Sequence, residues 1–250
     1  MERKQSASPF FGALLCFCLL TQLHSSGQTI SLGIETGYNR NHVSTNSSPY
    51  FFTTYKSMGG ANVAVPVQLK LNSWFGVQVA PTFIQKNYKL ERSDYYKGQY
   101  QEFHNNYFQL PVMAQFSYGI RQWEGFVSLG TYTAYWSSGS TKGRQPSMWN
   151  TGDASAQYQY TIFAANGPQE YNEPYHFDDR KDNRWEFGLL AGIGAQYAFP
   201  HCSKIYIEGR LYYALTDQQK NYMINQVPRY NTTTSISVGY LYTLPCRRMF

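Results

Sequence analysis

Residues 184–199 read RWEFGLLAGIGAQYAF, and the two faces of this stretch differ in size as well as in polarity. Large apolar side chains recur at every second position, which is the period of a β-strand. They are Phe187, Leu189, Ile193, Tyr197 and Phe199. The alternate positions are mostly small or polar, and three of them are glycine. A strand of a soluble sheet would point charged groups at water from this second face, so its near-emptiness needs another explanation.

Seven further segments alternate in the same way, with apolar residues on one face and polar or small residues on the other. These segments are residues 30–38, 61–71, 75–84, 107–118, 125–136, 205–215 and 234–244. The connections between the segments alternate strictly between long and short. The long connections are residues 39–60, 85–106, 137–183 and 216–233.

This alternation of loop lengths is typical of outer-membrane β-barrels, which have short periplasmic turns and long outer loops. Backbone polar groups within a bilayer must all be paired, which a sheet achieves only by closing on itself. We therefore predict an all-β fold: an eight-stranded antiparallel transmembrane β-barrel with long outer loops and both termini in the periplasm.

The composition agrees with a surface that contacts lipid. Charged residues make up 14% of the chain and aromatic residues 18%, whereas about 25% of an average soluble domain is charged. The mean hydropathy of −0.48 excludes a helical membrane protein. Tyrosines near the strand ends, such as Tyr38, Tyr118 and Tyr213, fit the aromatic girdles of a barrel.

The N-terminus predicts export. Two basic residues precede the apolar run 10–23, and small residues follow it. The run is too short to span a bilayer as a helix, and this order is that of a secretory signal peptide. We expect residues 1–27 to be the signal peptide and residues 28–250 to be the barrel domain, located in the cell outer membrane.

The mature chain would be moderately basic, but its basic residues are scattered. Nucleic-acid-binding domains cluster such residues on one face, so we expect no nucleic-acid partner. The expected partners are outer-membrane lipid and lipopolysaccharide, with another envelope protein as a further candidate.

The polar face of the strands should line the barrel lumen if the apolar face meets lipid. The interior of an eight-stranded barrel is only wide enough for side chains to fill. Glycines on this face would therefore make room for larger neighbours. The polar residues assigned to the lumen are Glu35, Gln68, Lys70, Gln78, Gln109, Gln115, Gln196, Glu208 and Arg210.

Glu35, Glu208 and Arg210 are the charged group of greatest interest in this set. An unpaired arginine in a narrow lumen would be costly, so the three are expected to form an inward ion-pair network. The alternative is a gate that opens a channel. Pro66, Pro81 and Pro111 fall inside three strands, where bulges or strand ends are expected because proline cannot donate to a ladder.

Cys202 and Cys246 are the two cysteines that remain after removal of the signal peptide. Cys202 lies in the turn after the sixth strand, and Cys246 follows the eighth strand. Both belong to the periplasmic end, and disulfides form in exported proteins. The two cysteines could form a disulfide or remain free thiols. Their shared position at the periplasmic end and the export of the chain favour the disulfide.

Three runs carry a resemblance to a known family: PTFIQKNYKLER (81–92), NNYFQLPVMAQFSY (105–118) and GFVSLGTYTAYW (125–136). The runs WEFGLLAGIGAQY (185–197) and SVGYLYTL (237–244) extend it. The chain resembles the PorT-like outer-membrane β-barrel proteins of Bacteroidota, often grouped as porin-family proteins. The resemblance covers essentially the whole mature chain and implies an eight-stranded barrel. The founding member is tied to type-nine protein secretion, a role that the resemblance does not transfer by itself.

The sequence contains no motif that selects a catalytic or metal site, so no cofactor or metal is expected and the protein is predicted not to be an enzyme. The histidines of the mature chain, His42, His104, His176 and His201, all fall in loops or turns without zinc-site spacing. Asp178, Asp179 and Asp182 lack the glycine turn and distal glutamate of a calcium loop. An outer-membrane enzyme acting on lipid would place serine, histidine and a carboxylate at the outer rim, and no spacing here picks such a set.

The third long connection is the strongest functional feature of the loops, because it is rich in aromatic residues. Its candidate contact residues are Trp149, Tyr158, Tyr160, Tyr171 and Tyr175. The loop could fold down as a cap over the barrel mouth, or bind a partner protein or surface glycan. The predicted function is a PorT-like scaffold or accessory of an envelope or protein-secretion machine, with a filled lumen. The alternatives are an outer-membrane enzyme acting on lipid and a narrow porin.

Overall fold

The computed structural model describes residues 29–45, 53–92, 98–146, 168–200, 202–222 and 226–244. The expected signal peptide, residues 1–27, lies outside the described residues. The described residues form a single antiparallel sheet of twelve strand segments. The segments are β1 (Thr29–Ser44), β2 (Thr53–Ala64), β3 (Val67–Lys70), β4 (Phe75–Val79), β5 (Thr82–Gln85), β6 (Tyr88–Arg92), β7 (Tyr100–Ile120), β8 (Trp123–Pro146), β9 (Pro168–Pro174), β10 (Trp185–Phe199), β11 (Ser203–Ala214) and β12 (Tyr230–Leu244).

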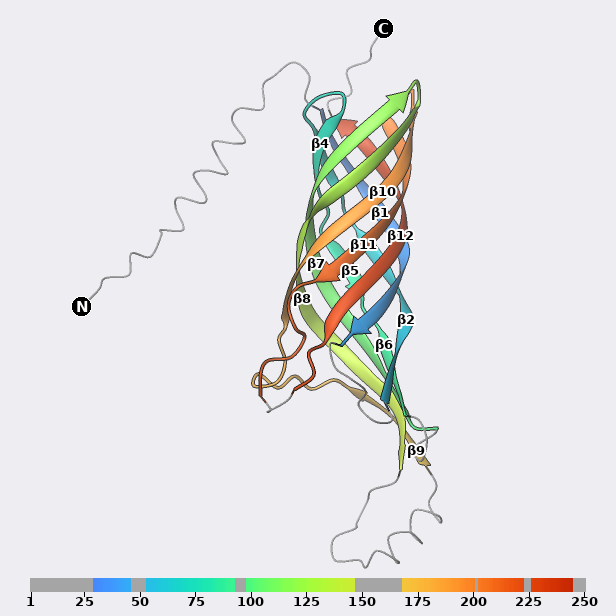
Figure 1. The fold of residues 1–250 in the computed structure, drawn as a ribbon. Coiled ribbons are helices and arrows are strands. Elements are labelled where there is room, and N and C mark those ends of the chain that lie inside the picture. Colours follow the sequence, from blue (N-terminus) through green and yellow to red (C-terminus); the bar gives the residue numbers. More distant parts are fainter. Residues whose placement is uncertain are drawn as a thin grey trace, which may run out of the picture.

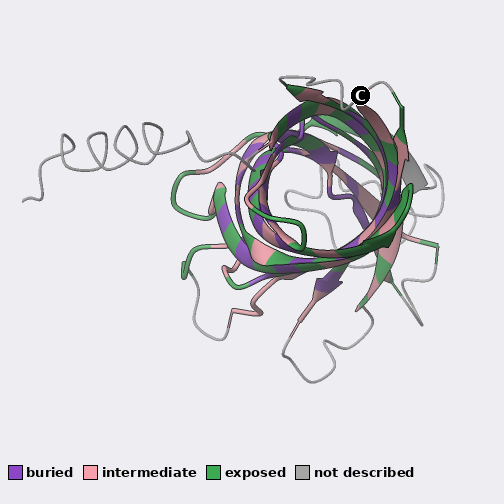
Figure 2. Cartoon of the chain, turned by 90° about the horizontal axis from the view of Figure 1, so that it is seen from above, coloured by how far each residue is buried: buried purple, intermediate pink, exposed green. Residues whose placement is uncertain are grey.

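The sheet closes on itself as a barrel (Figure 2). Segments β2 and β3 are consecutive parts of one strand, and β4, β5 and β6 are parts of the next. With β1, β7, β8, β10, β11 and β12 they form a ring of eight strands. The ring is sealed where the first strand meets the last, from the pair Ile30 and Leu244 to the pair Ser44 and Tyr230. The predicted eight-stranded antiparallel barrel is confirmed.

Two of the three strand prolines end a segment, and the third does not. Pro66 lies between β2 and β3, and Pro81 lies between β4 and β5. Pro111 stays inside β7 opposite Tyr132, and the irregularity in β7 falls instead between Asn106 and Tyr107. The ladder is continued across the proline positions by backbone bonds such as Ala80 N–H to Pro111 O, at 3.2 Å.

The two ends of the barrel differ in their connections (Figure 1). The turn end carries the short connections from β3 to β4, from β7 to β8 and from β10 to β11, together with the start of β1 and the end of β12. The loop end carries the long connections. No helix long and apolar enough to cross a bilayer occurs in the part of the chain that the structure describes.

Within the apolar band, side chains of the ring strands alternate between the outer wall and the lumen. The outward apolar residues form a band around the barrel. Examples from five strands are Ile34, Val112, Leu189, Ile207 and Val238, each at least 44% exposed. The inward residues include the polar set expected for the lumen, of which Glu35, Gln78 and Arg210 are at most 3% exposed.

The strands are longer at the loop end than the sequence pattern predicted. The predicted loop 137–183 is in part strand, because β8 continues to Pro146 and pairs with β9. The predicted loop 85–106 contains β6 and the start of β7. Beyond the apolar band both faces of these strands carry polar residues, so the period of two disappears from the sequence while the backbone ladder continues.

Candidate functional site: the filled lumen and its cap

The middle of the lumen holds a buried ion-pair network. Arg210 on β11 donates from Nη1 to Glu35 Oε1 and from Nη2 to Glu35 Oε2, at 2.8 Å each. Its Nη2 also donates to Glu208 Oε2 at 2.5 Å. The three side chains are each 1% exposed. The structure thus brings together the three charged residues that the sequence assigned to an inward network, and we call them the middle layer.

Hydroxyl groups complete the bonding of the two carboxylates in the middle layer. Tyr206 donates its hydroxyl to Glu35 Oε2 at 2.6 Å, and Ser128 donates to Glu208 Oε1 at 2.6 Å. Desolvating a carboxylate is costly unless its oxygens accept hydrogen bonds. Each oxygen of both groups has such a donor.

Inward glycines provide the space that this layer occupies. A Cβ built on Gly192 would lie 2.4 Å from Ser128 Oγ and 2.7 Å from Glu208 Oε1. A Cβ on Gly194 would lie 2.4 Å from the ring of Phe126. Real Cβ atoms do not approach other atoms so closely, so any larger residue at either position would displace the lumen side chains.

A second ion pair lies toward the turn end, and we call it the lower layer. Lys70 pairs with Glu124, whose other oxygen accepts a hydrogen bond from Gln196 at 2.6 Å. The amide of Gln68 donates to that of Gln115, and both residues are at most 4% exposed.

A third ion pair, the upper layer, lies toward the loop end. Lys86 Nζ is 2.5 Å from Glu186 Oε1, and the Lys86 side chain is fully buried. Tyr132 and Asn231 also donate to Glu186, at 2.8 and 2.7 Å. The ammonium group of Lys86 lies 4.7 Å from the centre of the Tyr132 ring and 5.1 Å from that of Tyr107, within the range of cation–π attraction.

The sequence did not single out Lys86 or Glu186 as lumen residues. Lys86 fell in a predicted loop, and Glu186 precedes the apolar positions of its strand. The signal that could have found them is the alternation of faces along a strand, because residues an even number of positions apart lie on the same face. Lys86 shares its face with inward Thr82, and Glu186 shares its face with Gly188. Gln109 is inward as expected, but neither atom of its buried amide has a hydrogen-bond partner within the described residues.

An aromatic stack closes the loop end of the lumen. The Trp136 ring on β8 stacks on Tyr107 with centroids 5.9 Å apart and on Tyr175 with centroids 4.9 Å apart. Phe177 packs edge-on against Trp136 at 4.9 Å. The guanidinium of Arg184 lies 4.2 Å from the Phe177 ring centre and 4.6 Å from that of Tyr135.

Hydrogen bonds join this stack to a second loop. Tyr175 donates its hydroxyl to Asp182 Oδ1 at 2.8 Å, and burial raises the pKa of the Tyr175 hydroxyl. Asp182 pairs with Gln219 through the backbone. Gln218 Nε2 donates to the Tyr107 hydroxyl at 3.2 Å. Residues 175–183 and 217–220 thus cover the mouth of the barrel together, and we call them the cap.

The expected loop residues separate into different places. Trp149, Tyr158 and Tyr160 lie outside the described residues. Tyr171 lies in β9 opposite Gly143, and Tyr175 belongs to the cap. The sequence analysis gave a cap over the barrel mouth as one of two alternatives for this loop, and Tyr175 does lie in such a cap. Partner binding by the loop stays a prediction.

Cys202 lies in the turn between β10 and β11 with φ at 60°, and it is disulfide-bonded. Its carbonyl accepts a hydrogen bond from the Thr243 N–H at 2.8 Å, which places the turn beside the end of β12. Cys246, the expected partner, lies outside the described residues, so this pairing stays a prediction.

The chemistry available in the lumen is the pairing of charges away from water. Three ion-pair layers lie at successive levels between the turn end and the cap. Among the described residues no group of three or more histidine, cysteine or acidic residues could hold a metal ion.

Solved outer-membrane proteins are similar to the chain at low sequence identity. Ail from Yersinia pestis, solved in complex with the heparin analogue sucrose octasulfate, is 16% identical over 85% of this chain and 99% of its own, with a TM-score of 0.39. OprG from Pseudomonas aeruginosa is 9% identical over 88% and 97%, with a TM-score of 0.43. The protease OmpT from Escherichia coli is 10% identical over 87% and 96%, with a TM-score of 0.29. No curated protein sequence matches the chain.

The family comparison is decisive. The model of the outer membrane protein beta-barrel domain matches residues 21–219, which is most of the chain. The match includes the strands that carry all three ion-pair layers, and the closed ring of eight strands agrees with it. The chain therefore belongs to the outer membrane protein β-barrel domain family and is a protein of the outer membrane.

Proposed function

We propose that this protein is a non-enzymatic, non-conducting barrel that serves as a scaffold or accessory of an envelope or protein-secretion machine. The observation that carries the proposal is the obstruction of the lumen by three ion-pair layers and an aromatic cap. A solute could pass only if Arg210 left Glu35 and Lys86 left Glu186. Breaking one buried pair of this kind costs about 3–5 kcal/mol.

The loop end offers the surface for a partner. There β8 and β9 project past the neighbouring strands (Figure 1), and this part of β8 carries polar residues such as Ser140 and Lys142, so we expect it to stand clear of the membrane. Glu173 on β9 and His176 beside the cap are both exposed. The resemblance to PorT-like barrels supports the envelope-machine role, because the founding member of that group is tied to protein secretion.

Site-specific crosslinking in intact outer membranes tests the partner. A photo-crosslinking residue at Glu173 should give a discrete protein adduct. The matched control is the same residue at Leu189, which is 50% exposed on the lipid-facing wall and should give no such adduct. Identical adduct patterns at both positions, or none at Glu173 and His176, would contradict the scaffold role.

Planar-bilayer recording tests the closed lumen. The purified barrel should show no steady single-channel conductance at neutral pH. Reproducible conductance would contradict this proposal and indicate that the protein is a narrow porin. Incubation with outer-membrane lipids should release no product, and saturable lipid turnover would assign an enzyme.

A further inference from the structure

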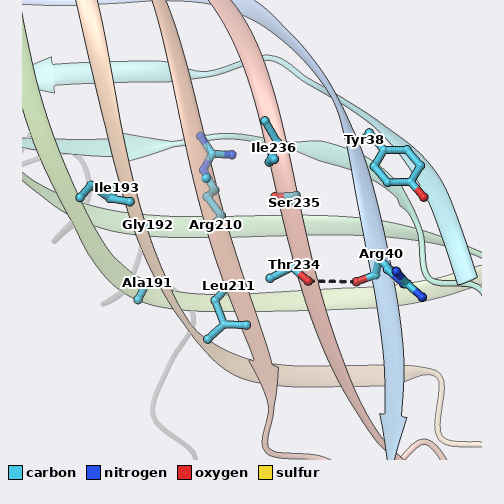
Figure 3. Close-up of a pocket in the computed structure, with 11 residues that line it drawn as sticks. Tyr38, Arg40, Ala191, Gly192, Ile193, Arg210, Leu211, Thr234, Ser235 and Ile236 are labelled. Atoms are coloured by element: carbon cyan, nitrogen blue, oxygen red, sulfur yellow. Dashed lines mark hydrogen bonds between the residues drawn. The ribbon is translucent and has the colours of Figure 1, made fainter. Parts of the chain in front are cut away.

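The lipid-facing wall carries a groove of about 620 Å³ across β1, β12, β11 and β10 (Figure 3). Its outward lining residues are almost all apolar or small, with one exception at its β1 border. That exception is Arg40, the next outward residue after Tyr38 along β1.

Two adjacent rows of cross-strand neighbours form the groove. The first row runs from Tyr38 through Ile236 and Gly209 to Ile193. The second row runs from Arg40 through Thr234 and Leu211 to Ala191. Each row contains small residues among large ones, and the absence of large side chains at Gly209 and Ala191 makes the hollow.

Gly209 forms the floor of the groove. A Cβ built there would have no neighbour closer than 3.9 Å, the carbonyl oxygen of Ile193. This is unlike Gly192 on the inner face, where a Cβ would clash at 2.4 Å. The glycine at position 209 is therefore not required by packing within the barrel, and the space above it is open to the membrane.

Arg40 marks the end of the apolar band. Tyr38 is 62% exposed on the same face, whereas the next outward residue after Arg40 is the polar His42. Arg40 is exposed, and its side chain makes no ion pair or hydrogen bond within the described part of the chain. Among the described residues its guanidinium is thus an unpaired cation, and its place just past the apolar band is where we expect lipid headgroups to meet the loop end.

Two forces can hold a lipid at such a place. Lipid tails are as apolar as leucine, so burial of an acyl chain by itself gains little over the surrounding bilayer. A specific lipid is held by close packing of its acyl chain into a hollow and by a charge-assisted contact to its anionic headgroup. These two contacts distinguish it from the other lipids of the bilayer. The loop end faces outward in barrels of this kind, where the outer-leaflet lipid is a phosphorylated glycolipid.

We propose that the groove is a binding site for lipopolysaccharide, with one acyl chain over Gly209 and a lipid phosphate on the Arg40 guanidinium. The site is independent of the scaffold role, because none of its outward residues belongs to the lumen or to the cap. Arg210 meets the groove only along its backbone, since its side chain pairs with Glu35.

Binding of the purified, folded barrel to lipopolysaccharide in detergent tests the site, with native mass spectrometry as the readout. Arg40→Gln should weaken binding about fivefold, the effect of one basic residue near anionic lipid. Removal of the lipid phosphates should weaken wild-type binding by a similar factor. Arg40→Lys should restore most of the affinity, and Gly209→Phe should weaken it by filling the groove.

The matched control is Gly125→Phe. Gly125 is also an outward glycine with no neighbour closer than 3.9 Å to a built Cβ. It lies in a smaller hollow of about 260 Å³ at the turn end, whose lining has no cation. This variant should bind lipopolysaccharide as the wild type does.

Three outcomes would overturn the proposal. The first is unchanged binding by Arg40→Gln, which alters an exposed side chain and so decides the matter even if Gly209→Phe fails to fold. The second is an equal loss in Gly125→Phe. The third is binding of phosphatidylglycerol with the same affinity and the same dependence on Arg40, which would show a general anionic-lipid contact instead.

Discussion

Arg210 and Glu35 form a bidentate ion pair across the seam of the barrel, with both bonds at 2.8 Å. Arg210 stands on β11 and Glu35 on β1, and β12 lies between them. The pair therefore bridges the junction where the last strand closes against the first. A contact between residues 175 positions apart in sequence ties the two ends of the chain together inside the lumen.

Replacing Arg210 by methionine should destabilise the barrel strongly. Glu35 and Glu208 would keep their buried charges without a cation, at a cost of about 3–5 kcal/mol in the free energy of unfolding. Urea unfolding in detergent, followed by tryptophan fluorescence, measures this. The matched control is Lys56→Met, which breaks an exposed pair with Glu91 and should cost only about 0–1 kcal/mol. Equal losses of unfolding free energy in the two variants would show that the Arg210 ion pairs do not stabilise the barrel.

Replacement by leucine should destabilise the barrel at an inward glycine and have no effect at an outward one. Gly192→Leu drives a side chain into Ser128 and Glu208, and overpacking of this kind costs about 1–3 kcal/mol or more. Gly209→Leu points into open space on the outer wall and should leave folding unchanged. Heat-modifiable gel mobility reports the folded fraction of each variant. A folded fraction for Gly192→Leu equal to that of Gly209→Leu would argue against a filled lumen.

The cap should loosen at alkaline pH. Burial raises the pKa of Tyr175 above its ordinary value of about 10, so the folded protein favours the protonated hydroxyl. The stability gained is fully present below the ordinary pKa and is lost as the pH rises through the folded pKa. Hydrogen exchange of residues 175–183 should increase at high pH in the wild type.

Tyr175→Phe is the control for this effect. It keeps the ring against Trp136 but lacks the titrating hydroxyl, so its cap should be less protected at neutral pH and should lose the dependence on Tyr175 ionisation. An ultraviolet difference titration between the two proteins gives the Tyr175 pKa directly. A value at or below about 10 would contradict the burial of this hydroxyl.

Cys202 and Cys246 should be joined by a disulfide. Thr243 bonds to the Cys202 carbonyl, and Cys246 follows three residues later, so the two cysteines start from neighbouring strands. The denatured mature protein should react with a thiol reagent only after reduction. Equal labelling with and without reductant would show two free thiols.

The sequence predicted much of this architecture from a single property, the parity of residues along each strand. Parity assigned Glu35, Glu208 and Arg210 to the lumen and Phe187, Leu189 and Ile193 to lipid. It lost its signal at the loop end, where both faces are polar. Lys86 still has the parity of inward Thr82, but the apolar positions of its segment end at Ile84, so it was assigned to a loop, although its side chain is fully buried against Glu186.

What the sequence determined by itself is the number of strands, their closure and the direction of each face, because a bilayer demands a period of two and complete backbone pairing. It also explains the near-empty face of residues 184–199, whose glycines leave room in a narrow lumen. Only the tertiary structure decided which side chains contact one another. The Lys86–Glu186 pair, the stack on Trp136 and the groove above Gly209 depend on the register between strands, which sets the side chains that meet across the lumen or along the wall.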